Sequence, residues 1–306
     1  MIYFESPVPH FCSEIFLECG VPHAFTTRRG GVSTGDFDSL NVSTRRCDSF
    51  GNTDMYENTV ENFARVLSIV GASVQHSVCA HQVHGNNVLE LCENHGGMGI
   101  LRDARINVDA DGLYVKGMNS SIEAVCVKSA DCTPVLFADK HTGSVCAVHS
   151  GWRGTVLDIP GEAVRTMVKN GSRKEDILCC VGPCIGVCCY EVSSDVFTEA
   201  EKTLKEKNAA FLLDNLFVNR RETELGTKYD FNIGKMCAEL VHLSGVPLEN
   251  IEFSDMCTCF LFFRPGFRYQ SIHKTMGILI FYIEITQYGK YGSSYKIYNQ
   301  IFHCIM

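Results

Sequence analysis

The sequence lacks any apolar run of the roughly 18 residues that a membrane-spanning helix needs. Its most apolar C-terminal stretch, Gly277–Ile285, has only the length of a strand. The N-terminus carries Glu5 and no basic segment, so no secretory signal is predicted. Basic residues are also few, since 27 Lys and Arg stand against 35 Asp and Glu and give a net charge of −8. This balance disfavours nucleic-acid binding, for which a basic face is typical, but it permits a local basic pocket for an anionic substrate.

Several catalytic signatures are absent as well. There is no HExxH, no P-loop and no GxGxxG. The hydrolytic-deaminase pattern of His-x-Glu with Pro-Cys-x-x-Cys is also missing, since Pro183-Cys184 is followed by Cys188. None of the 11 histidines belongs to a His-x-His pair. Multicopper oxidases bind three of their coppers with such pairs, so four-copper chemistry is not expected.

The chain also has no internal repeat and no linker rich in Pro, Gly or Ser. At about 150 residues per domain the length allows two domains, but without a linker we predict one. Apolar periodicity alternates between helical and strand-like segments, which is typical of an α/β domain of mixed β-sheets with flanking helices. Helices are predicted at 56–70, 161–169, 192–208 and 232–244, and strands at 23–27, 88–91, 121–127, 134–138, 144–148 and 177–181.

Cysteine is abundant, with 17 in 306 residues. An odd number in a long chain without a secretory signal predicts reduced thiols and a cytoplasmic location. Most of these thiols are expected to act as small buried hydrophobes. The run Cys179, Cys180, Cys184, Cys188 and Cys189 lacks paired CxxC spacing and has apolar neighbours. We interpret it as buried core followed by a glycine turn.

Three short stretches each carry a metal-ligand type at the end of a strand-like segment. They are HQVHG with His84, SADCTPV with Cys132 and AVHSGWRGT with His149. Two imidazoles and a thiolate suit Zn²⁺, and three protein ligands leave the fourth coordination position open for water or substrate. On residue types alone, the interpretation of the three as unrelated core or turn residues is favoured.

The order of the motifs adds a stronger signal. FTTRRGGVS (25–33), SLNVS (39–43), the three stretches above and GPCIGVCCYEV (182–192) follow one another along the chain. Together, from Phe25 to Cys259, they resemble the laccase-domain or polyphenol-oxidase-like family, understood as purine nucleoside phosphorylases with adenosine deaminase activity. The resemblance implies a single layered α/β sandwich, related in fold to a bacterial deamidase toxin. It also implies a zinc ion held by His84, Cys132 and His149.

The resemblance further implies substrates and roles. The substrates are adenosine, inosine and S-methyl-5′-thioadenosine together with inorganic phosphate, and adenosine is also deaminated. Phosphorolysis needs cations around the phosphate, and Arg153, Arg28 and Arg29 are the candidates. Asn41 is a candidate for binding the ribose or base edge. Asp131, next to Cys132, is a candidate either for supporting this metal ligand or for acid–base catalysis.

Each of these residues has a structural alternative. Arg153 can form an ion pair at a turn, and Asn41 can form a turn or cap a helix. Asp131 can cap a backbone N–H. For His81 a structural role is favoured over that of a ligand, and for Trp152 core packing is favoured over stacking on substrate. The family's name implies copper, but the missing His-x-His pairs make zinc the favoured ion.

The C-terminus departs from the family pattern. After Cys257-Thr258 the family continues with a Phe-rich segment, an Arg-rich turn and a last glycine-bearing strand. In this chain Phe262–Arg264 resemble the first of these and Met276–Ile285 resemble the last strand. We divide the chain into a lead-in (1–21), the family domain (22–286) and an atypical tail (287–306). Two rival functions stay open: a metal-free cysteine hydrolase or deamidase using Cys132 and His149, and a scaffold whose pocket has decayed. The sequence does not determine the oligomeric state.

Overall fold

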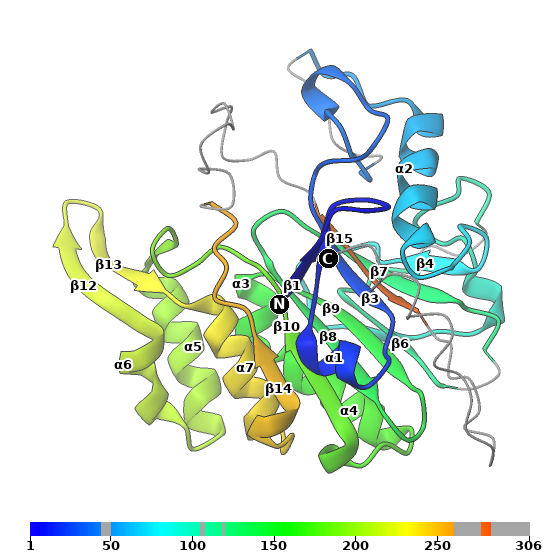
Figure 1. The fold of residues 1–306 in the computed structure, drawn as a ribbon. Coiled ribbons are helices and arrows are strands. Elements are labelled where there is room, and N and C mark those ends of the chain that lie inside the picture. Colours follow the sequence, from blue (N-terminus) through cyan, green and yellow to red (C-terminus); the bar gives the residue numbers. More distant parts are fainter. Residues whose placement is uncertain (44–49, 105–107, 118–119, 260–276, 283–306) are drawn as a thin grey trace, which may run out of the picture.

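The computed structural model describes residues 1–43, 50–104, 108–117, 120–259 and 277–282, the last as backbone only. Two six-stranded sheets form its centre (Figure 1). In order across the first sheet lie β1 (Ile2–Phe4), β2 (His10–Cys12), β3 (His23–Thr26), β15 (Gly277–Tyr282), β7 (Ala124–Ser129) and β4 (Ser77–Cys79). In order across the second lie β14 (Ile251–Phe253), β10 (Ile177–Val181), β8 (Thr133–Asp139), β9 (Val145–Ser150), β6 (Gly112–Val115) and β5 (Val88–Glu90).

A third, smaller sheet and the helices complete the molecule. The small sheet has the order β11 (Glu191–Ser193), β13 (Gly226–Phe231), β12 (Phe217–Thr223). The α-helices are α1 (Glu14–Glu18), α2 (Tyr56–Ser68), α3 (Trp152–Val156), α4 (Ile159–Lys169), α5 (Ser194–Glu206), α6 (Leu213–Leu216) and α7 (Ile233–Leu243). Short 3₁₀ turns are η1 (Gly35–Phe37), η2 (Glu93–His95), η3 (Lys174–Asp176), η4 (Ala210–Leu212) and η5 (Leu248–Asn250). Within the described ranges, no helix is both long and apolar enough to span a bilayer.

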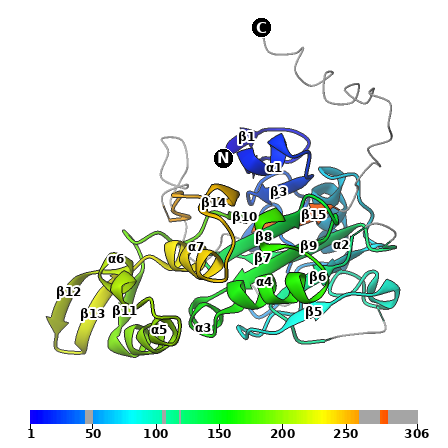
Figure 2. The same cartoon turned by 90° about the horizontal axis from the view of Figure 1, so that it is seen from below.

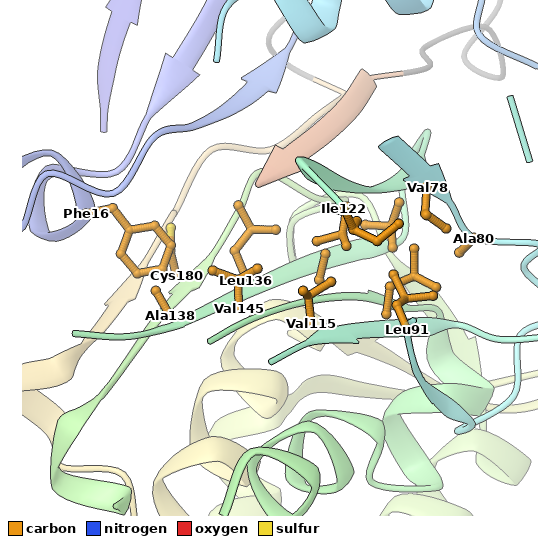
Figure 3. Packing of buried hydrophobic residues seen from close by; sticks show 14 of the residues in the cluster. Phe16, Val78, Ala80, Leu91, Val115, Ile122, Leu136, Ala138, Val145 and Cys180 are labelled. Carbon is orange, nitrogen blue, oxygen red and sulfur yellow. The ribbon is translucent and has the colours of Figure 1, made fainter. Parts of the chain in front are cut away.

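The main core lies between the two large sheets (Figure 3). Because side chains alternate along a strand, β8 sends Leu136 and Ala138 into this core and Val135 and Phe137 to the opposite face. The strands β9 and β10 alternate in the same way. Such strands are buried on both faces, which explains why their sequences are apolar throughout.

Helices cover the outer faces of both sheets. On the first sheet, α2 packs Phe63, Val66 and Leu67 against β4 and β7. On the second, α4 and α7 pack against β8, β9 and β10. The order of layers is therefore helix, sheet, sheet, helix, which confirms the expected α/β class with mixed sheets and flanking helices.

The small sheet forms a separate layer with α5 and α6. Figure 2 shows it at one end of the molecule, beyond α7. Its core contains Phe217 and Phe231 with rings stacked at 4.4 Å between centroids. One face of α7 closes this cluster while its other face packs on the second sheet, so α7 joins the two parts.

Most of the predicted elements are present. The helices expected at 56–70, 161–169, 192–208 and 232–244 are α2, α4, α5 and α7. The strand expected within Met276–Ile285 is β15, which pairs antiparallel with both β3 and β7. The residues compared with the family's Phe-rich segment, Phe262–Arg264, and the tail 287–306 lie outside the described residues.

Candidate active site and metal centre

The structure brings three sequence-predicted residues together. One ligand atom each from His84, Cys132 and His149 lies within 4.8 Å of the other two. His84 belongs to the loop after β4, Cys132 to the turn between β7 and β8, and His149 to β9. Three separate segments therefore build one His₂Cys donor set of the kind that binds zinc.

Strand register explains why Cys132 and His149 meet. The strands β8 and β9 pair antiparallel with Thr133 opposite Ser150, so Cys132 lies beside Gly151. A Cβ atom on Gly151 would lie 2.9 Å from Cδ2 of His84 and 3.2 Å from Sγ of Cys132. Glycine in the HSGW motif therefore leaves room for the donor groups, because any larger residue would force His84 to move and would crowd Cys132.

A buried carboxylate that the sequence analysis missed, Asp111, holds the site together. It accepts hydrogen bonds from the backbone N–H groups of Val83, His84 and Gly85 at 3.1, 3.0 and 2.8 Å. It also accepts one from Nδ1 of His149 at 2.8 Å. Burial acts to raise the pKa of Asp111, but these hydrogen bonds outweigh it and lower the pKa below its ordinary value.

The contact with Asp111 also sets the orientation of His149. An ionised carboxylate only accepts hydrogen bonds, so Nδ1 carries a proton and Nε2 is the nitrogen available to Cys132. Burial acts to lower the pKa of His149, but hydrogen bonds to Asp111 and Cys132 raise it to about 9. Metal-binding histidines are commonly held by a carboxylate in this way.

The loop that carries His84 is fastened at a second point. The Gln82 amide donates to the carbonyl of Lys128 at 2.6 Å and accepts from its N–H at 2.7 Å, which ties the loop to β7. His84 itself has a φ of +62°, a conformation that costs energy for a non-glycine residue. Burial lowers the pKa of His84, and the neighbouring His149 lowers it further.

A cation and a hydroxyl lie beside the donor set. The exposed guanidinium of Arg153 stacks over the ring of Trp152 at 4.5 Å. Within the described residues Arg153 forms no ion pair, so the structural alternative of an acidic partner at a turn is not observed there. The positive charge of Arg153 acts to lower the pKa of both His84 and Tyr190, which places it near these two residues. Tyr190 is a second residue to which the sequence analysis gave no role. Burial and the nearby Cys132 raise the pKa of Tyr190 to about 12, so its hydroxyl stays protonated.

Trp152 combines packing with this contact. Its ring is half-buried against the cluster of α5, α6 and α7. The predicted packing role is therefore confirmed, and the same ring also stacks with the guanidinium of Arg153.

Asp131 links three segments next to Cys132. Its carboxylate accepts a hydrogen bond from the hydroxyl of Thr258 at 2.7 Å. Its carbonyl accepts one from the N–H of Ile185 at 2.8 Å. These contacts join the Cys132 turn to the 182–190 segment and to residues 257–259.

The polar residues of the 28–43 segment have contacts of their own. Arg28 donates to the carbonyl of Asp38, and the exposed Arg29 donates its backbone N–H to Thr27. The buried Asn41 donates to Asp54 at 2.9 Å and accepts from the N–H of Ser43 at 3.2 Å. This is the turn-forming role given above as the alternative for Asn41.

His81 pairs with the carboxylate of Asp109 and is not part of the donor set. Its Nδ1 lies 2.6 Å from Oδ1 of Asp109. Its buried Nε2 has no hydrogen-bond partner within the described residues. The ligand group contains His84 and not His81, in agreement with the structural role expected for His81.

Comparisons with known proteins now identify the family. A family model described as multi-copper polyphenol oxidoreductase laccase matches residues 22–280. A purine nucleoside phosphorylase YlmD of Geobacillus stearothermophilus is 30% identical over 250 residues, covering 79% of this chain and 85% of the relative. A purine nucleoside phosphorylase YfiH of Escherichia coli is 31% identical over 239 residues, covering 78% and 84%.

Solved structures agree with this assignment. The hypothetical protein YfiH of Bacillus licheniformis has a TM-score of 0.75 at 25% identity, covering 92% of this chain and 98% of that one. The YlmD structure from Geobacillus stearothermophilus has a TM-score of 0.73 at 26% identity, covering 92% and 99%. With both the sequence motifs and the layered sandwich in common, the chain belongs to the polyphenol-oxidoreductase laccase-domain family that includes the YlmD and YfiH proteins.

Proposed function

We propose that this chain is a zinc-dependent purine nucleoside phosphorylase. Its substrates would be adenosine, inosine and S-methyl-5′-thioadenosine, each cleaved by phosphate to the free base and the sugar 1-phosphate, and adenosine would also be deaminated. The observation that carries the proposal is the convergence of His84, Cys132 and His149. The names of the curated relatives support the reaction class.

The donor set fits zinc. Two imidazoles and one thiol match the ligand types that Zn²⁺ prefers, and Asp111 orients both histidines from behind. Zinc bound there supplies Lewis acidity toward the nucleoside, at a centre with three protein ligands. Copper, which the family description names, is less suited because the chain has no His-x-His pair.

Several side chains are assigned to the substrate. Arg153 is positioned to bind the phosphate near the anomeric carbon, because its charge faces the donor set and no carboxylate neutralises it within the described residues. Tyr190 offers a protonated hydroxyl as a hydrogen-bond donor. Arg29 is a further candidate for the phosphate. Arg28 and Asn41 shape their own loop through Asp38 and Asp54, as the contacts above describe.

Asp131 is assigned a positioning role. Its carboxylate is engaged by Thr258, so we propose that it holds the Cys132 turn in place. It would then act on catalysis through Cys132.

One specific observation also fits a second function. Cys132, His149 and Asp111 follow one another as a nucleophile, its base and the group that orients the base, which is the arrangement of a cysteine hydrolase. The mechanism of such an enzyme does not require a second histidine, His84, beside the thiol. The convergence of His84 with Cys132 and His149 therefore favours a metal site over a cysteine nucleophile.

The experiment separates the two functions. Purified protein is incubated with inosine and with adenosine, with and without phosphate, and the products are resolved by chromatography. We expect hypoxanthine only when phosphate is present, loss of both reactions after chelation, and recovery on adding zinc. Cys132→Ala should lose the zinc bound with His84 and His149 and both activities, while Cys19→Ala at an exposed thiol serves as the control. Full activity of metal-free protein would instead support the thiol nucleophile.

A further inference from the structure

A second group of thiols lies apart from the proposed zinc ligands. The prediction that the 179–189 cysteines are buried core is confirmed for Cys179, Cys180 and Cys184. It is wrong for Cys188, which is exposed, and Cys189 is half-buried. These two residues follow the glycine turn and face a segment about 70 residues further along the chain.

The Sγ atoms of Cys188, Cys189 and Cys257 lie within 4.8 Å of one another. A fourth thiol, Cys259, interacts with Cys189 and Cys257. All four are thiols rather than disulfides. Three sulfurs therefore form one group drawn from two distant segments, and Cys259 adds a fourth sulfur next to two of them.

The backbone around these thiols is well defined. The N–H of Cys189 donates to the carbonyl of Gly186 at 2.9 Å, which closes a turn that presents the adjacent cysteines. Cys184 and Cys257 form a parallel bridge, and the N–H of Thr258 donates to the carbonyl of Cys184 at 2.9 Å. Main-chain contacts thus hold the two segments side by side, independently of any metal bound by the sulfurs.

We propose that Cys188, Cys189, Cys257 and Cys259 form a second metal site, which binds Zn²⁺ through four thiolates. Sulfur donors alone select soft ions such as zinc, and four sulfurs can satisfy its tetrahedral preference. The function of this ion is structural, because no ligand position is left for a substrate. This site is independent of the proposed phosphorylase activity.

One further contact fits a thiolate better than a thiol. The N–H of Gly186 donates to Sγ of Cys257 at 3.2 Å, a contact that is stronger when the sulfur is charged. A Cβ on Gly186 would lie 3.2 Å from Sγ of Cys257 and 3.3 Å from Sγ of Cys188. Glycine at this position therefore lets the main chain approach both sulfurs, as in the support that commonly surrounds metal ligands.

The position of the group suggests what the ion does. Thr258 lies between Cys257 and Cys259, and its hydroxyl donates to Asp131 next to Cys132. An ion that joins the 186–189 turn to residues 257–259 would fix Thr258 against Asp131. The second metal would thereby stabilise one edge of the catalytic site without taking part in the reaction.

Zinc content measures this site directly. Full-length protein is purified with zinc present, dialysed, and analysed for metal by mass spectrometry. His84→Ala should retain the zinc bound by the four thiols, which separates this site from the proposed catalytic one. Cys188→Ser and Cys257→Ser should each lose that ion, whereas Cys19→Ser, at an exposed cysteine outside the group, should keep it. Cobalt added to the His84→Ala protein should give strong thiolate-to-metal charge-transfer absorption that Cys188→Ser abolishes.

Clear results would overturn the proposal. One is zinc content in Cys188→Ser equal to that of Cys19→Ser, with both variants folded by circular dichroism. Another is a wild-type protein in which the four cysteines bind no zinc and are joined in disulfides, as shown by peptide mass mapping without reductant. Iron in place of zinc would also refute the assignment. Because Cys188 is exposed, its serine variant should fold even if Cys257→Ser does not.

Discussion

Replacing Asp111 by asparagine tests whether one buried carboxylate holds the site together. Its Oδ1 accepts from His84 and His149, and its Oδ2 accepts from Val83 and Gly85. In the variant one oxygen becomes an NH₂ group. At the Oδ2 position it meets the N–H groups of Val83 and Gly85, whereas at the Oδ1 position it meets only that of His84, because Nδ1 of His149 accepts once the imidazole proton moves to Nε2. The second orientation costs less, and with one donor left without an acceptor the metal-free protein should lose about 2 kcal/mol of stability.

Urea denaturation and zinc titration measure the two consequences. The free energy of unfolding should fall by that amount, and zinc affinity should fall about 10- to 100-fold because His149 is no longer oriented. Asp109→Asn is the matched control, because Asp109 also contacts a histidine but has a side chain that is 66% exposed. It should change stability by about 1 kcal/mol or less. An Asp111→Asn protein with wild-type stability and zinc affinity would refute the role given to this carboxylate.

Three other predictions concern single residues. Arg153→Ala should reduce phosphorolysis about 100- to 1,000-fold with zinc content unchanged. Arg165→Ala is the control and should leave turnover unchanged, because Arg165 pairs with Asp158 and Glu162. Unchanged turnover of Arg153→Ala would show that Arg153 has only a structural role. Gly151→Ala should abolish zinc binding at the site of His84, Cys132 and His149 while the protein stays folded, and Gly85→Ala, whose Cβ would meet nothing closer than 3.7 Å, should keep that zinc; equal zinc content in both would contradict the steric argument. Burial lowers the pKa of His23 to about 4 in the folded protein. As the pH falls below about 6.5, His23 is therefore protonated in the unfolded chain before it is protonated in the folded one. The contribution of His23 to stability is complete above that pH and should drop by about 2 kcal/mol between pH 7 and pH 5, a loss that urea titrations of wild type and His23→Gln can resolve.

The central strands and long helices could be predicted because their patterns are set locally. In β8 and β10 every residue is buried, so the apolar run is visible without knowledge of the neighbours. In α4, Pro160 lies in the first turn and Gly171, with φ of +107°, follows the last. These positions have the same conformational requirement in any fold.

The donor residues could be found by type, whereas Asp111 could not. Its role depends on the pairing of β6 with β9, which sets Gly112 opposite Val148 and brings the N–H of His149 to the carbonyl of Asp111. Register of this kind is a property of two segments, and nothing in either segment alone reveals it. An aspartate directly before an apolar strand was the only signal in the sequence.

The 184–190 segment was misjudged in part for a related reason. Its cysteines were grouped by proximity in sequence, and apolar neighbours suggested that all were buried. The isolated bridge between Cys184 and Cys257 brings a distant segment beside Cys188 and Cys189. The strands β12 and β13 were not predicted either, because their outward residues are polar and their pairing extends away from the main core.

The position of β15 has a consequence for synthesis of the chain. This strand lies between β3 and β7, so Ala24 and Cys126 become neighbours in the sheet only through Ile280. During translation β1, β2 and β3 emerge first, yet their sheet cannot be completed until residues 277–282 have left the ribosome. Until then β3 and β7 each present an open edge able to pair with another nascent chain. We therefore expect shielding of these edges by a chaperone to govern the yield of folded protein more strongly than the stability of the finished sandwich.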